Sequence, residues 1–80
     1  MARVVSSGPF SIYVYAEAGQ PHHLPHCHVR WSEGSTQVAL PTLRVLAGDP
    51  LPAAARRLLL DHLEAICGAW ERLNPGRPIA

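Results

Sequence analysis

Apolar and polar residues alternate along the first half of the chain, as in strands that have one buried face. Residues 10–16 place four apolar side chains on one face and three polar or aromatic ones on the other: Phe10, Ile12, Val14 and Ala16 against Ser11, Tyr13 and Tyr15. Glycine and proline predict a loop over 17–25. Further strands are predicted at about 26–32 and 36–40, with a turn between them, and a short fourth strand at 43–46.

The second half has the spacing of a helix. Its apolar residues recur every three or four positions and form one stripe of an amphipathic helix: Ala55, Leu59, Leu63, Ile66, Trp70 and Leu73. Asp49 is the predicted N-cap, and Asn74 before Pro75 is the predicted end. One continuous helix of about 22 residues would be about 33 Å long. Because a small sheet needs less than that, a break is expected near 60–62 or 67–68.

These patterns predict an α+β fold in a single small domain over residues 1–80. An antiparallel sheet of three to four strands is expected first, followed by one long or two short C-terminal helices packed on one face. The inward-facing strand residues, such as Ile12, Val29 and Val38, would meet the helical stripe. The opposite face of the sheet would then carry the polar and aromatic side chains.

Composition narrows the classes of function. The chain has 80 residues and a formal net charge of +1, and all seven of its basic residues are arginine. Non-specific nucleic-acid binding depends on many phosphate contacts, so no tight binding to generic DNA is expected. A domain of this size buries a modest share of its surface. A protein partner, or a second copy in a homodimer, is therefore expected to stabilise it.

Sequence features also indicate a cellular compartment. The two cysteines, Cys27 and Cys67, lie far apart and do not suggest a disulfide framework. The first residues lack the pattern of a signal peptide, and the longest apolar stretches are too short to span a membrane. A cytoplasmic protein without membrane association is expected.

Four of the five histidines lie within seven residues, between His22 and His28, and the fifth is His62. Core packing alone does not concentrate histidine in this way, and histidine changes charge near neutral pH. Strand alternation places five residues together on the face away from the helices, and these are the predicted binding residues: Tyr13, Tyr15, His26, His28 and Arg30. The same alternation turns Cys27 inward.

No cofactor is expected, and a divalent metal ion is the one alternative that this segment raises. Two residues apart on a strand, His26 and His28 would have Cα atoms about 6.5–7 Å apart, and their imidazoles could reach one ion. His22 or His23 could supply a further nitrogen. No acidic or thiolate ligand completes a closed structural site, so folding is expected to need no metal. Alternatively, the histidines stack with the tyrosines and form hydrogen bonds to the loop backbone.

Two functional interpretations of the same face remain open. Metal-independent ribonucleases use histidine, tyrosine and arginine for proton transfer and for stabilising charge on phosphate. If the protein is an enzyme, the catalytic residues would be His26, His28, Arg30 and Tyr15. Tyrosine and arginine are also favoured in protein–protein interfaces. This second interpretation, in which the protein is not an enzyme, is the preferred one.

The segment Leu24-Pro25-His26-Cys27-His28-Val29-Arg30 resembles the Pro-Pro-His-x-His-Val motif of a bacterial family of small proteins, domain-of-unknown-function family 4160. The resemblance extends over about residues 9–73, from the aromatic strand Tyr13-Val14-Tyr15 to the helix end at Ala69-Trp70-Glu71-Arg72. It implies a sheet followed by a helical half, and an association with two-gene modules of toxin–antitoxin type. It implies no catalytic mechanism.

Together these observations predict a small cytoplasmic protein-interaction module that acts by binding a protein partner. A component of a toxin–antitoxin system is the expected setting, and an inhibitor encoded by a mobile element is a variant of it. The alternative is a histidine-dependent or metal-dependent nuclease that uses the His-x-His face.

Overall fold

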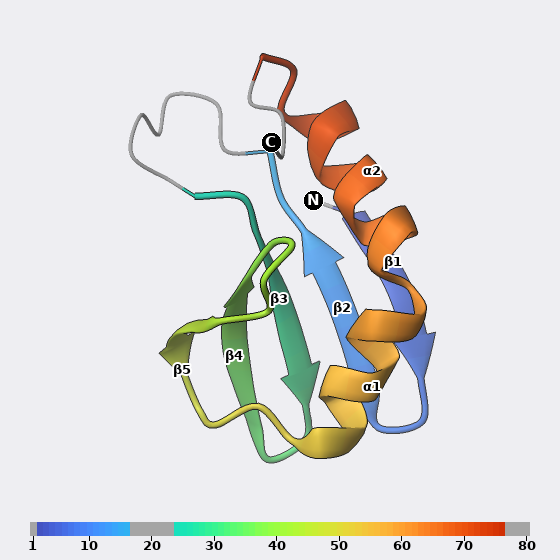
Figure 1. Cartoon of the computed structure of the whole chain (residues 1–80). Coiled ribbons are helices and arrows are strands. Elements are labelled where there is room, and N and C mark those ends of the chain that lie inside the picture. Colours follow the sequence, from blue (N-terminus) through green and yellow to red (C-terminus); the bar gives the residue numbers. More distant parts are fainter. Residues whose placement is uncertain (1, 17–23, 77–80) are drawn as a thin grey trace.

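The chain builds a five-stranded antiparallel sheet and two helices in the computed structural model, which describes residues 2–16 and 24–76 (Figure 1). The elements are β1 (Ala2–Ser7), β2 (Phe10–Val14), β3 (His26–Trp31), β4 (Gly34–Ala39), β5 (Val45–Gly48), α1 (Ala53–Asp61) and α2 (Leu63–Leu73). The strands lie in chain order, and each pairs antiparallel with the next. Both helices lie on one face of the sheet, and the predicted α+β class is confirmed.

The sheet has five strands where three to four were expected. The additional strand is β1, whose sequence does not alternate regularly between apolar and polar residues. Its register against β2 shifts between Arg3 and Val5, and Val4 and Val5 both pack against the core. A bulge breaks the period-two pattern, and this explains why the pattern did not reveal the strand.

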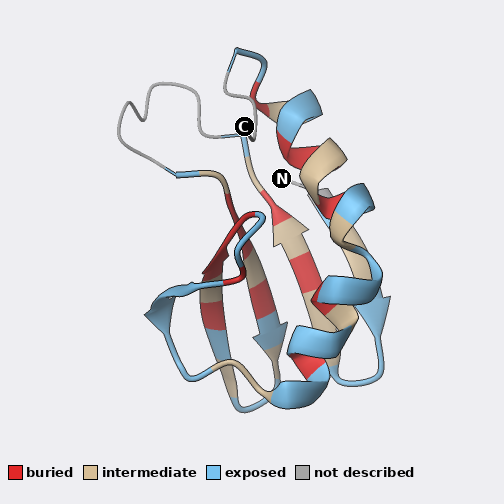
Figure 2. Ribbon diagram, viewed as in Figure 1, coloured by how far each residue is buried: buried red, intermediate tan, exposed pale blue. Residues whose placement is uncertain are grey.

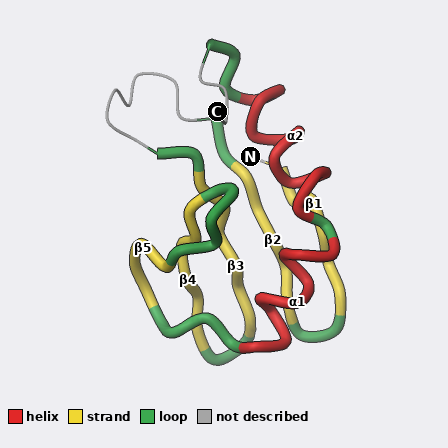
Figure 3. The backbone as a smooth tube through the Cα atoms, in the orientation of Figure 1, coloured by secondary structure: helices red, strands yellow, loops and turns green. Residues whose placement is uncertain are grey.

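The predicted fourth strand at 43–46 begins later in the structure, at Val45. Leu43 has a positive φ of 63°, which no strand residue adopts, and its side chain is buried in the core. The connection between β4 and β5 thus folds over the helix side of the sheet before β5 begins (Figure 3). Leu43 fills the core from a turn and not from a strand.

The helical half is divided at His62, within the predicted range for a break. Four of the six stripe residues are buried (Ala55, Leu59, Ile66 and Trp70), and the other two are half-buried. The prediction of Asp49 as N-cap was wrong. The N-cap is Pro52, without a side-chain cap, and Asp49 Oδ2 instead accepts a hydrogen bond from the Ser35 backbone N–H at 3.0 Å.

Buried side chains from both layers form one core. Its residues come from β2, β3 and β4, from the connection after β4, and from both helices (Figure 2): Ile12, Val14, Cys27, Val29, Val38, Leu40, Leu43, Ala55, Leu59, Ile66, Ala69 and Trp70. Asn74 closes the end of this core, since its Nδ2 donates to Tyr15 O and to Trp70 O, both at 3.1 Å. The C-terminal end of α2 is thereby attached to the chain just after β2.

Because the thiol of Cys27 is buried, the protein should lose stability at alkaline pH. Burial, and to a smaller extent the nearby Cys67, raises the pKa of the Cys27 thiol from 9.0 to about 12. The folded state favours the protonated thiol, so its contribution is complete below pH 9 and is lost as pH rises towards 12. We expect the melting temperature to fall between pH 9 and 11 by more in the wild type than in Cys27→Ala. Equal slopes in thermal melts would contradict this prediction.

Candidate functional site

The sheet face opposite the helices carries two rows of side chains that register across the strands. Directly paired residues on antiparallel strands project to the same face. One row runs Arg3, Tyr13, His28, Gln37 and Ala47, and the other runs Ser6, Ser11, Arg30 and Ser35. With Tyr15, which follows β2, we call these ten residues the open face.

Four of the predicted binding residues contact one another on the open face. The rings of Tyr13 and Tyr15 stack with centroids 6.3 Å apart and an interplanar angle of 20°. The imidazole of His28 meets Tyr15 edge-on, with centroids 4.6 Å apart. The guanidinium carbon of Arg30 lies 5.4 Å from the centroid of the Tyr13 ring, within cation–π range. Alternation and register therefore build one continuous aromatic and cationic cluster.

His26 differs from the sequence-based expectation of an exposed side chain. It is only 4% exposed, and its ring centroid lies 5.5 Å from Trp70 and 5.1 Å from His28. Its Nδ1 lies 2.7 Å from Leu24 O, and because a carbonyl only accepts, Nδ1 donates the proton. β3 begins at His26, where the Trp70 indole packs beside it. Of the alternative interpretation, His26 shows the hydrogen bond to the loop backbone, but its aromatic neighbour is Trp70 and not a tyrosine.

The suggested metal ligands are only partly described. His22 and His23 lie outside the described residues. Within residues 2–16 and 24–76, no group of three or more histidine, cysteine or acidic residues is arranged to hold a metal ion. Of the two described histidines in the set, His26 already uses Nδ1 for the Leu24 carbonyl.

A hollow of about 240 Å³ opens beside the aromatic cluster. It is lined from β3, β4 and β5 by His28, Arg30, Ser35, Thr36, Gln37, Ala47 and Gly48. Gly48 has a φ of 93°, and a Cβ atom there would approach Ser35 O to 2.6 Å. Glycine thus lets β5 lie close to β4 at the edge of the hollow. The sequence pattern does not mark Ser35 and Gln37 as site residues, because only the strand register places them beside Arg30 and His28.

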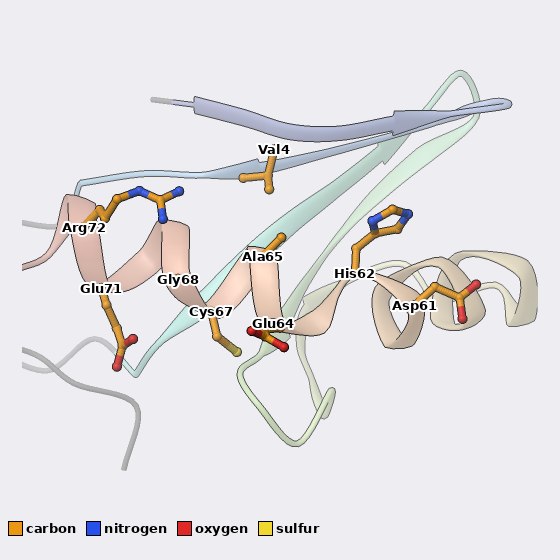
Figure 4. A pocket seen from close by; sticks show the side chains of 9 residues that line it. All are labelled: Val4, Asp61, His62, Glu64, Ala65, Cys67, Gly68, Glu71 and Arg72. Carbon is orange, nitrogen blue, oxygen red and sulfur yellow. The ribbon is translucent and has the colours of Figure 1, made fainter.

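A larger groove of about 800 Å³ lies between β1 and the helices (Figure 4). Its titratable side chains do not converge. Figure 4 shows His62 and Arg72 on the side of α2 that faces Val4, and Cys67 and Glu71 on the other side. Burial raises the pKa of Cys67, and the Glu71 carboxylate adds a smaller rise in the same direction. A thiol held in its protonated form is a poor nucleophile, so the open face is the stronger candidate site.

The family model described as Domain of unknown function (DUF4160) matches residues 10–71. The chain belongs to this family. The region that matches DUF4160 begins at the first residue of β2 and ends within α2. It contains Tyr13, Tyr15, His28 and Arg30, whereas β1 and Asn74 lie outside it.

Two further comparisons found no relatives of this DUF4160 protein. No curated protein matches the chain, and no solved structure matches it. Neither described helix is long and apolar enough to cross a membrane.

Proposed function

We propose that this DUF4160 protein is a small interaction module that binds a protein partner through the open face. The observation that carries the proposal is the contacting cluster of Tyr13, Tyr15, His28 and Arg30 on the side of the sheet that no described helix covers. Tyrosine and arginine are the residues that most often dominate binding energy in protein interfaces. The rings hold one another in place, so binding would cost little side-chain entropy.

The proposed setting is a cytoplasmic two-gene module of toxin–antitoxin type, or an inhibitor encoded by a mobile element. The partner would be the product of the neighbouring gene, with a homodimer as the alternative arrangement. One observation supports a reducing compartment: Cys27 and Cys67 are both free.

The nuclease hypothesis has less support from the geometry. It needs the His26 and His28 rings to act on one substrate, but His26 is buried against Trp70 and its Nδ1 is bonded to Leu24 O. His28 still contacts the Tyr15 ring and lines the hollow together with Arg30. Ribonuclease assays on the isolated protein therefore belong in the test of the proposed function.

We expect Tyr13→Ser to weaken the partner complex about 30-fold or more, since loss of a central tyrosine typically costs about 2 kcal/mol of binding. The chain would be co-expressed with the product of the adjacent gene, and the complex quantified by calorimetry. Arg57→Gln is the matched control, because Arg57 is exposed on α1, on the other side of the sheet. A complex equally strong in Tyr13→Ser, or RNA cleavage by the isolated wild type, would reject the proposal.

A further inference from the structure

We infer that the hollow beside the aromatic cluster receives the carboxylate of an acidic side chain from the protein partner. The inference rests on the proposed function and specifies the chemistry of the partner. Among the residues that line the hollow are Arg30, Ser35, Gln37 and His28. Each of these side chains carries a group that can donate a hydrogen bond, and they belong to two neighbouring strands, β3 and β4.

Charge on the open face favours an anionic group. Its two rows contain two arginines, Arg3 and Arg30, at either side of Tyr13, and within these described rows no residue is acidic. The carboxylate of Asp49 lies near the β4 end of the second row, where it accepts the backbone N–H of Ser35 and leaves the Ser35 hydroxyl for another partner. A face with two arginines and no acidic residue in its two described rows complements an acidic segment.

The geometry of Arg30 suits a carboxylate. A guanidinium presents paired N–H donors that match the two oxygens of a carboxylate. Arg30 is exposed on the sheet, and the Tyr13 ring lies 5.4 Å beneath its guanidinium carbon. The ring limits the directions in which the guanidinium can turn, and His28 borders the same hollow. The arginine is thereby partly positioned before a ligand arrives.

The size of the hollow favours a side chain over a nucleotide. Its volume of about 240 Å³ is below the range of about 300–1,000 Å³ that is usual for sites enclosing a whole small molecule. Proteins that bind single-stranded RNA also need a positively charged groove that follows several phosphates. The two registered rows supply only Arg3 and Arg30. An acidic side chain, flanked by contacts to Tyr13 and Tyr15, fits these dimensions and this charge.

Two terminally blocked hexapeptides test the inference. One contains two tyrosines and two glutamates, and the other has glutamine in place of each glutamate. They would be titrated into the isotopically labelled full chain and followed by NMR. The glutamate peptide is expected to shift the amide signals of Arg30, Ser35 and Gln37, and to bind about 10-fold more tightly than the glutamine peptide, since hydrogen bonds to charged groups are the stronger ones.

Arg30→Gln should remove this preference, and Arg57→Gln should retain it. Equal affinities for the two peptides, or no shifts with the glutamate peptide, would overturn the inference. Tighter binding of a hexauridylate than of the glutamate peptide would overturn it in favour of RNA. If the preference for glutamate is absent while Tyr13→Ser still disrupts the partner complex, the inference of a bound carboxylate is wrong and the proposed function is retained. If Tyr13→Ser leaves the partner complex intact, the proposed function is rejected.

Discussion

Trp70→Ala is expected to lower the free energy of unfolding by about 3–5 kcal/mol, the usual cost of removing a large buried aromatic side chain. Trp70 has no exposed surface, and its indole packs in the core beside the ring of His26. Small domains have about 5–15 kcal/mol of stability in total. The variant should therefore unfold at a much lower urea concentration than the wild type, with a large unfolded fraction at 37 °C.

Leu60→Ala is the matched control for this measurement. Leu60 lies on α1 but is 54% exposed, so its truncation should change stability by less than about 0.5 kcal/mol. Urea unfolding followed by circular dichroism would measure both variants, because the signal does not depend on the tryptophan that is removed. Similar midpoints for Trp70→Ala and the wild type would show that the helices do not pack on the sheet in the orientation described.

The two histidines of the His-x-His motif should respond in opposite ways to truncation. His26→Ala is expected to cost about 2–4 kcal/mol of stability, because it leaves a cavity beside Trp70 and removes the hydrogen bond to the Leu24 carbonyl. His28 is only half-buried on the open face, and His28→Ala should cost less than about 1 kcal/mol. Its main effect should be a weaker partner complex at unchanged melting temperature.

Urea unfolding of each single variant, together with calorimetry of the partner complex, would separate the two roles. A loss of stability as small in His26→Ala as in His28→Ala would mean that His26 is not part of the core. A large loss in His28→Ala would mean that the whole motif is scaffold. Either result would contradict the division between a structural His26 and a recognition residue at position 28.

Strand periodicity was sufficient for part of the site. A period of two assigns Tyr13 and Tyr15 to one face, and His28 and Arg30 to one face of the next strand, from local sequence alone. The structure places these four in contact. It also places Cys27 and Val29 in the core, as the alternation predicts. The helical stripe was equally informative, since the spacing of its apolar residues depends only on the helix itself.

The sequence did not predict which strands would contribute to the hollow. Ser35 and Gln37 come beside Arg30 and His28 only because β4 pairs with β3 in one register, and Ala47 and Gly48 are added by the pairing of β5. A register shifted by one residue would turn each of these side chains to the other face. The composition of the hollow is a property of the assembled sheet.

The amino-acid sequence by itself determined the α+β class, the helical stripe and the shared face of the tyrosines, His28 and Arg30, because these follow from periods of two and 3.6 residues within single elements. Tertiary structure alone decided that β1 joins the sheet through a bulge, that Asp49 bonds to Ser35 and does not cap α1, and that His26 belongs to the core. Each of these depends on what a residue distant in sequence places beside it. For His26 that residue is Trp70, on the helix that packs over the sheet.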